Sequence, residues 1–120
     1  VKEAVQLLAA RRIGAVPVID GDAVIGIFSE RDVIHSLERE GAAALDRRVS
    51  ELMTSPAITV TPAESILAAL ALMTRRRIRH LPVIEGGKCV GLVSIGDLVK
   101  HRIERIESEA EAMRSYIQSA

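Results

Sequence analysis

Aromatic residues are almost absent from this sequence, whose 120 residues include one Phe, one Tyr and no Trp. Such a chain lacks the aromatic platforms on which proteins stack single-stranded nucleic acids. Its 16 basic and 16 acidic side chains balance, so no general electrostatic attraction draws it to nucleic acid or to an anionic membrane. Binding to nucleic acid or to a membrane is therefore not expected.

Cysteine, catalytic motifs and long apolar runs are also scarce. Cys89 is the only cysteine, so it has no partner for an intrachain disulfide, and we expect it to be buried in a strand and inert. His35, His80 and His101 lack the spacing of metal ligands. No G-x-S-x-G, P-loop or Rossmann glycine pattern occurs, and no segment resembles a membrane helix or a signal peptide. These absences predict a cytoplasmic protein that is not an enzyme and has no metal or catalytic cofactor.

What the sequence does contain is an internal repeat. The segment IGAVPVIDGDAVIGIFSERD over 13–32 recurs 65 positions later, without a gap, as IRHLPVIEGGKCVGLVSIGD over 78–97. Self-similarity of this kind indicates a duplicated structural unit. Two copies predict one compact pair, in which aliphatic side chains fill the core.

Each copy is expected to form a β-hairpin between two helices, which makes the fold class α+β. In the first copy, Asp20-Gly21-Asp22 predicts the hairpin turn, and Gly26 predicts a bulge or a close approach of another backbone. The expected elements are a helix over 1–12, strands over 15–19 and 23–28, and a helix over 30–39 that Ser29 caps and Gly41 ends. A linker follows over 42–54, with a short helix that buries Val49, Leu52 and Met53.

The second copy has one element more, an opening strand over 57–60 with no counterpart 65 residues earlier. Pro62 is expected to open a helix over 63–77. Hairpin strands are expected over 80–84 and 88–93, followed by a helix that Ser94 caps and that runs to about residue 119. The predicted domains are a first unit over 1–41, the linker over 42–54, a second unit over 55–103 and a helical extension over 104–120.

That extension keeps helical spacing of apolar residues past the end of the repeat, at Ile103, Ile106, Ala110, Met113 and Ile117. Two interpretations stay open. The stripe can lie on its own domain, or it can form a contact between subunits.

The element order is strand–helix–strand–strand–helix. One strand carries L-P-V-I-E-G, and the strand-to-helix turn carries G-h-h-S-x-x-D, where h is an apolar residue and x is any residue. This combination resembles the cystathionine-β-synthase (CBS) domain. Two in tandem are similar to a CBS pair, or Bateman module, and phrases such as GIFSERDV and RIRHLPVIEGGKCVGLVSIGDLV resemble small stand-alone CBS-pair proteins. The resemblance implies two pseudo-twofold-related β-α-β-β-α units packed through their sheets, the first without its opening strand. It also implies two clefts that bind adenosine-containing ligands.

The Ser-x-x-Asp corner of each copy has two interpretations. Ser29 with Asp32, and Ser94 with Asp97, can form a capping box, although Asp is shorter than the Glu that this box prefers. They can instead bind a nucleotide, because a helix N-terminus suits phosphate and a carboxylate can accept both ribose hydroxyls. Duplication within the family pattern favours the nucleotide.

The resemblance also implies which residues complete each cleft. In the first, aliphatic side chains would sandwich adenine, and Arg79, His80 and Arg31 are candidates for phosphate contacts, or simply solvated surface side chains. The residues predicted for the first cleft are Ser29, Arg31, Asp32, Ile58, Thr59, Val60, Pro62, Ile78, Arg79 and His80. Those predicted for the second cleft, which lacks its strand, are Ile13, Gly14, Ala15, Ser94 and Asp97.

The expected function is therefore a regulatory, energy-sensing module that binds AMP, ADP, ATP, NAD(H) or an S-adenosylmethionine derivative. A homodimer and an effector protein that responds to ligand occupancy are the expected partners. The alternative is a CBS-type module with empty clefts that serves oligomerisation.

Overall fold

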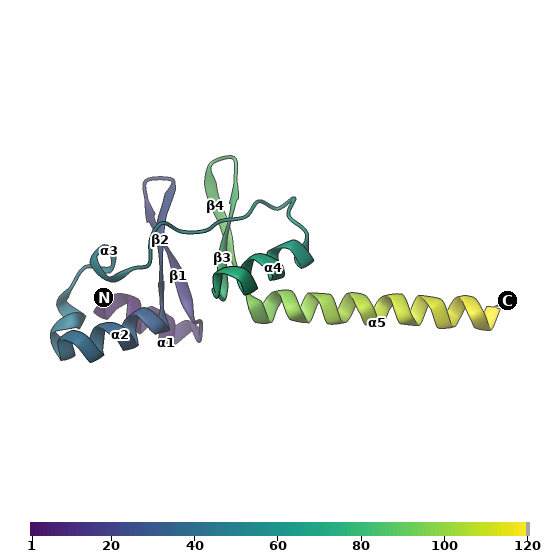
Figure 1. The fold of residues 1–120 in the computed structure, drawn as a ribbon, viewed down its shortest axis with the longest axis horizontal. Helices are drawn as coiled ribbons and strands as arrows, with labels where there is room; N and C mark the ends of the chain where they lie inside the picture. The colour runs from purple at the N-terminus through teal and green to yellow at the C-terminus, as the bar shows by residue number, and fades with distance from the viewer. Residues whose placement is uncertain (120) are drawn as a thin grey trace. The chain divides into compact units, whose positions relative to one another are not determined.

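The computed structural model describes residues 1–119 and contains both helices and strands (Figure 1). Two antiparallel hairpins form its two small sheets, in agreement with the α+β prediction. The chain divides into two compact units, residues 1–62 with 81–92 and residues 63–80 with 93–120. In chain order the elements are α1 (Lys2–Arg11), β1 (Ala15–Asp20), β2 (Ala23–Ser29), α2 (Glu30–Glu40), the 3-10 helix η1 (Gly41–Asp46), α3 (Val49–Leu52), α4 (Ile66–Arg76), β3 (His80–Glu85), β4 (Lys88–Ser94) and α5 (Ile95–Ser119).

The repeat is reproduced in backbone detail where each first helix ends. Arg12 and Arg77 both adopt a left-handed conformation, with φ of 51° and 54°. The amide of Ile13 donates to the Leu8 carbonyl at 3.1 Å, and that of Ile78 donates to the Met73 carbonyl at 3.0 Å. Equivalent bonds of this kind satisfy the last carbonyls of a helix. Both copies therefore turn from helix to strand in the same way.

Gly26 accounts for an irregularity in the first hairpin. Val18 pairs with Gly26 but Ile19 pairs with Val24, so the register shifts by one residue at this point. A Cβ built on Gly26 would lie 2.6 Å from the Met53 sulfur and 2.8 Å from the Thr54 carbonyl oxygen. The predicted bulge and the predicted close approach are thus both present, since only glycine leaves room for a backbone this near.

The linker lies against this hairpin and the end of α2. Thr54 and Ile27 exchange two backbone hydrogen bonds of 2.9 Å. Arg47 pairs with both Glu40 and Glu51. The linker helix expected to bury Val49, Leu52 and Met53 leaves all three only half-buried, and Ala44 of η1 is the buried residue instead. That part of the prediction was wrong because a four-residue helix cannot cover its own apolar side.

Two predicted element boundaries in the second copy were also wrong. The expected strand over 57–60 is reduced to one bridge, in which the Val60 amide donates to the Pro82 carbonyl at 3.0 Å and the Val60 carbonyl accepts from Ile84 at 2.8 Å. The ladder does not extend back toward residue 57, because Pro82 has no N–H to donate to the Ile58 carbonyl. The next helix begins at Ile66 rather than after Pro62, because the Ser65 hydroxyl accepts from the Ala68 amide at 3.1 Å and caps it there.

The buried apolar residues differ between the units. In residues 1–62 and 81–92 they are Leu8, Ala15, Phe28, Ala44, Val60 and Leu81. In the other unit, α4 buries Ala69 and Met73, and α5 buries Leu98. Cys89 is half-buried rather than buried, and its thiol lies 3.4 Å from the Gly91 carbonyl. Among the helices described over residues 1–119, none has both the length and the apolar character needed to cross a bilayer.

Candidate functional site

The first Ser-x-x-Asp corner lies where β2 passes into α2. Ser29 has extended backbone angles and its hydroxyl oxygen accepts from the Asp32 amide at 3.4 Å. In return, Asp32 Oδ2 accepts from the Ser29 amide at 2.8 Å and from the Ser29 hydroxyl at 3.1 Å. Despite its shorter side chain, Asp32 therefore closes a complete capping box.

A third residue, which the sequence pattern did not predict, completes this network. The Thr54 hydroxyl donates to Asp32 Oδ1 at 2.9 Å, so donors engage both carboxylate oxygens. Thr54 arrives there because its backbone pairs with Ile27 beside Gly26. Glycine at position 26 was the sequence signal of an approaching segment, but it did not identify which segment approaches.

The second corner repeats the geometry at the start of α5. The Ser94 amide donates to Asp97 Oδ2 at 2.9 Å, and the Ser94 hydroxyl accepts from the Asp97 amide at 3.1 Å. The backbone N–H of Ser94 lowers the pKa of the Asp97 carboxyl below its ordinary value, with further contributions from the Ser94 side chain, His80 and His101. Asp97 is exposed, whereas Asp32 is half-buried.

Both helix N-termini already use part of their hydrogen-bonding capacity within the protein. The Glu30 amide donates to the Gly14 carbonyl at 3.0 Å, and the Ile95 amide donates to the Arg79 carbonyl at 2.8 Å. These two bonds are again equivalent in the repeat. They leave fewer free N–H groups at each helix start for an anion.

The predicted first-cleft residues are divided between the two compact units. Residues 29, 31, 32, 58, 59, 60 and 62 belong to the first unit, and residues 78–80 to the second. Within the first unit Val60 is buried and Ile58 is half-buried, whereas Arg31, Thr59 and Pro62 are exposed. In the second unit Arg79 is exposed, and Ile78 and His80 are half-buried.

The predicted second-cleft residues are divided in the same way. Ile13, Gly14 and Ala15 belong to the first unit, and Ser94 and Asp97 to the second. Ala15 is fully buried, backbone included, and pairs with Ser29 in the β1–β2 ladder. Gly14 already uses its carbonyl for the Glu30 amide.

A small polar pocket adjoins Asp32 within the first unit. Its lining residues are Asp32, His35, Glu38, Arg39 and Leu52. The His35 side chain is exposed. No group of three or more His, Cys, Asp or Glu side chains suited to a metal ion occurs among residues 1–119.

Comparison with known proteins identifies the family. The model of the CBS domain matches residues 1–39 and 49–104. The chain belongs to the CBS domain family. The match covers both copies of the repeat and most of the chain, and CBS-pair proteins are its structural neighbours.

Individual relatives agree with this assignment. A mitochondrial CBS domain-containing protein of Arabidopsis thaliana, CBSX3, is 36% identical over 98% of this chain, which spans only 60% of that protein's length. A signal-transduction protein with CBS domains from Burkholderia ambifaria is 45% identical, with a TM-score of 0.78 over 85% of this chain and 75% of its own. CBSX2, solved in complex with AMP, is 25% identical, with a TM-score of 0.71 over 85% of this chain and 80% of its own.

Proposed function

We propose that this protein is a regulatory module that binds an adenosine-containing nucleotide through its Ser-x-x-Asp corners. The observation that carries the proposal is the duplicated corner, in which a serine and an aspartate are held together at a helix start in both copies. The AMP bound to its structural neighbour CBSX2 supports AMP as the first ligand to test. ATP, NAD(H) and S-adenosylmethionine remain the other candidates.

The hydrogen bonds of Asp32 suggest how a ribose would bind. Oδ1 accepts from the Thr54 hydroxyl and Oδ2 accepts from the Ser29 hydroxyl, so both oxygens accept O–H donors already. Ribose 2′- and 3′-hydroxyls are donors of the same type. Exchange of one hydroxyl donor for another keeps the carboxylate satisfied and costs little free energy.

In this proposal each predicted residue keeps its role. Asp32 holds the ribose, the aliphatic side chains Ile58, Val60 and Ile78 contact adenine, and Arg79 and His80 contact the phosphate. Ligand occupancy would shift the equilibrium between two arrangements of the protein, which an effector protein would read. The module itself would perform no catalysis, and we expect it to act in the cytoplasm as a homodimer.

Thermal melting with and without each ligand tests this function. A ligand that binds the native state at 100 times its Kd stabilises it by about 2.7 kcal/mol. We expect AMP or another adenosine nucleotide to raise the Tm, and Asp32→Ala to remove most of that rise. Glu38→Ala, which changes an acidic residue near Asp32 outside the predicted cleft, is the matched control. If no adenosine ligand raises the Tm, nucleotide binding is rejected.

The second candidate function is assembly without a nucleotide. The exposed apolar residues along α5 favour it, since six of them from Val99 to Ile117, Tyr116 included, have exposed fractions of 42% or more. Under this function the protein would self-associate and no ligand would change its Tm.

A further inference from the structure

The apolar residues of α5 follow the seven-residue period of a coiled coil. Val99, Ile103, Ile106, Ala110, Met113 and Ile117 are separated alternately by four and three residues. This alternation places them at the a and d positions of successive heptads, with Ile103, Ala110 and Ile117 at a. A strict 3.5-residue period is what lets two helices supercoil while keeping one seam in contact.

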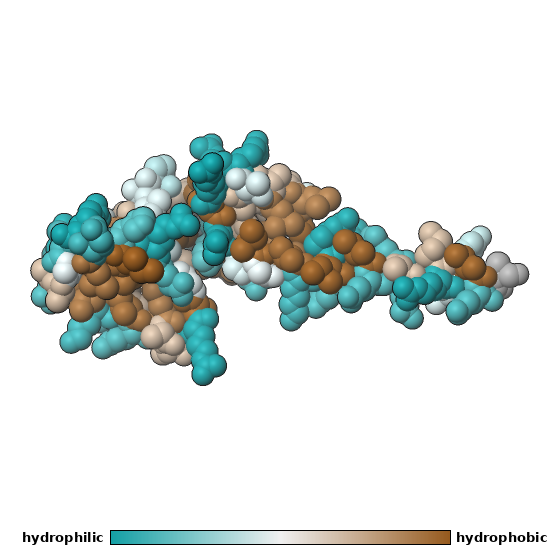
Figure 2. Space-filling view, turned by 60° about the horizontal axis from the view of Figure 1, so that its bottom comes forward, coloured by the Kyte–Doolittle hydropathy of each residue, from teal (hydrophilic) through white to brown (hydrophobic). Residues whose placement is uncertain are grey.

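This seam is not the face that α5 buries in its own unit. Leu98 is 8% exposed, whereas the seam residues Val99, Ile103 and Ile106 are 42%, 50% and 49% exposed. Further along, Met113 and Ile117 are 61% and 66% exposed. Figure 2 shows apolar patches recurring along α5 as far as its end. Five of the six seam residues are therefore exposed, and Ala110 among them is half-buried.

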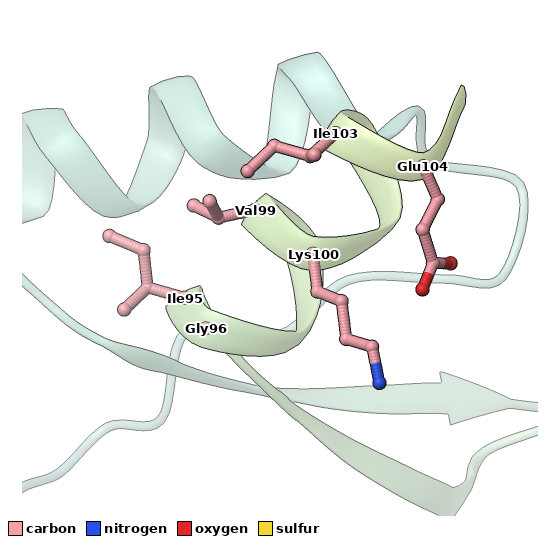
Figure 3. A pocket seen from close by; sticks show the side chains of 6 residues that line it. All are labelled: Ile95, Gly96, Val99, Lys100, Ile103 and Glu104. Carbon is pink, nitrogen blue, oxygen red and sulfur yellow. The ribbon is translucent and has the colours of Figure 1, made fainter. Parts of the chain in front are cut away.

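The start of the seam forms a shallow apolar groove. Ile95, Val99 and Ile103 project to one side from successive turns, and Lys100 and Glu104 project away from them (Figure 3). α4 lies along this first part of α5, and the rest of α5 extends past α4 (Figure 1). The seam therefore begins in this groove and continues along the part of α5 that extends past α4.

Charge excludes a membrane as the occupant of this surface. α5 carries five acidic residues and four basic ones. A helix that lies on an anionic membrane has a polar face rich in Lys and Arg. The near balance of charge on α5 favours another helix of mixed charge instead.

The charges that flank the seam match a second copy of the same helix. Arg102 and Glu109 occupy g positions, and Glu107 and Arg114 occupy e positions. When two copies lie parallel and in register, each g residue faces the e residue five positions later on the other copy. Arg102 then faces Glu107 and Glu109 faces Arg114, so every flanking pair has opposite charges, twice over by symmetry.

An antiparallel pair of helices that covers the whole seam would instead bring like charges together. It would place Glu107 against Glu107 and Glu109 against Glu109. It would also bring Lys100 close to Arg114. Like charges across a helix pair are destabilising. Of the two arrangements that cover the seam completely, only the parallel one pairs opposite charges.

We propose that α5 forms a parallel, in-register, two-stranded coiled coil with a second copy of this chain. The proposal specifies an interface for the homodimer expected above and does not depend on nucleotide binding. On its own helix Glu109 pairs with Arg105 at 3.4 Å, and both side chains are more than 60% exposed. Glu109 can therefore turn toward Arg114 of the second copy without a buried contact being broken.

Disulfide cross-linking tests the orientation. In a Cys89→Ser background, Met113→Cys places a thiol at a d position, where two parallel copies bring it next to itself. We expect mild oxidation to convert this variant largely to a covalent dimer. Ser108→Cys, on the outer side of the same helix, is the matched control and should cross-link at least tenfold more slowly.

Two cross-linking results would overturn the proposal. One is a Met113→Cys variant that cross-links no faster than Ser108→Cys. The other is cross-linking that needs a mixture of Ile103→Cys and Met113→Cys chains, which would indicate antiparallel helices. If Cys89→Ser does not fold, as judged by circular dichroism, the same rates are compared with Cys89 retained and the unsubstituted protein as baseline.

A charge exchange tests the flanking pairs. Arg114→Glu creates two like-charged pairs in the parallel dimer and should weaken dimerisation by roughly fivefold to thirtyfold, measured by analytical ultracentrifugation. Adding Glu109→Arg restores opposite charges and should recover much of the loss. Ser108→Glu, which adds the same charge outside the seam, should have little effect. A monomeric or trimeric starting protein, or no recovery in the double variant, would contradict the proposal. Both experiments are done without nucleotide. Their failure would therefore not bear on the proposal of nucleotide binding, which is tested by melting.

Discussion

The two copies of the repeat share a backbone and differ in what surrounds it. In the first copy, Gly26 lies against Met53 and Thr54, and the Thr54 hydroxyl reaches Asp32. In the second copy, a Cβ built on Gly91 meets no atom of the described residues within 4 Å apart from those of its own chain neighbours. Asp97 is correspondingly more exposed than Asp32. The duplicated sequence thus determines the local backbone conformation of both copies. Contacts with the linker, by contrast, occur around the glycine and aspartate of the first copy.

The largest expected effect is the difference in stability between alanine substitutions at Gly26 and at Gly91. Gly26→Ala forces a Cβ against the Thr54 carbonyl, which is backbone and cannot move without displacing the linker. We expect a loss of about 1–3 kcal/mol in the free energy of unfolding, measured by urea denaturation. Gly91→Ala meets open space and should change stability by less than about 0.5 kcal/mol. Equal losses in the two variants would refute the difference in packing.

The next effect concerns the two capping serines. Ser29→Ala removes an acceptor for the Asp32 amide and a donor to the Asp32 carboxylate, and should cost about 1–2 kcal/mol. Ser94→Ala loses a cap on a more exposed helix start and should cost about 0.5–1 kcal/mol. Denaturant midpoints of the two variants give the comparison. A greater loss for Ser94→Ala would reverse the ranking of the corners.

Thr54 supplies an interaction specific to the first copy. Thr54→Val removes the donor to Asp32 Oδ1 while keeping the shape of the side chain. Because Thr54 is exposed, water replaces part of the lost bond, and we expect a cost of about 1 kcal/mol or less. Thr61→Val, at another exposed threonine, is the control. A cost no larger than that control would show that Thr54 does not support Asp32.

The smallest effect is a pH dependence at the second corner. The folded protein lowers the pKa of Asp97, chiefly through the Ser94 N–H, so the ionised carboxylate stabilises the fold above its unfolded pKa of about 3.9. This contribution is lost as the pH falls through the lower folded pKa. Unfolding free energies measured from pH 5 to pH 2.5 should show the advantage of the natural protein over Asp97→Asn shrinking toward acid. A stability difference between the two proteins that stays constant over that pH range would contradict the lowered pKa of Asp97.

The sequence predicted those features of the fold and the site that are caused by residues close together in the chain. Ser29, Ser94 and the Asp20-Gly21-Asp22 turn act on their own neighbours, and the hairpins and the helix starts at Glu30 and Ile95 agree with the predictions. The bulge at Gly26 was likewise predicted. Local hydrogen bonds and backbone preferences are encoded within a few residues.

The features that were missed depend on distant segments. Thr54 contacts Asp32 across 22 residues of chain, and no spacing rule connects the two. The strand predicted over 57–60 depended on how much of β3 it could pair with, and only Val60 does so. The α4 start was misplaced because Ser65 competes with Pro62 as a helix initiator. The ligand residues of each cleft remain predictions, since they come from both compact units.

The most direct test of the account is a calorimetric titration of AMP into the protein, Asp32→Ala and Asp97→Ala. We expect the natural protein to bind AMP and Asp32→Ala to lose at least tenfold in affinity, with a smaller loss for Asp97→Ala. The packed first corner would then be the principal nucleotide site. Unchanged AMP affinity in Asp32→Ala, or a greater loss in Asp97→Ala, would contradict that claim.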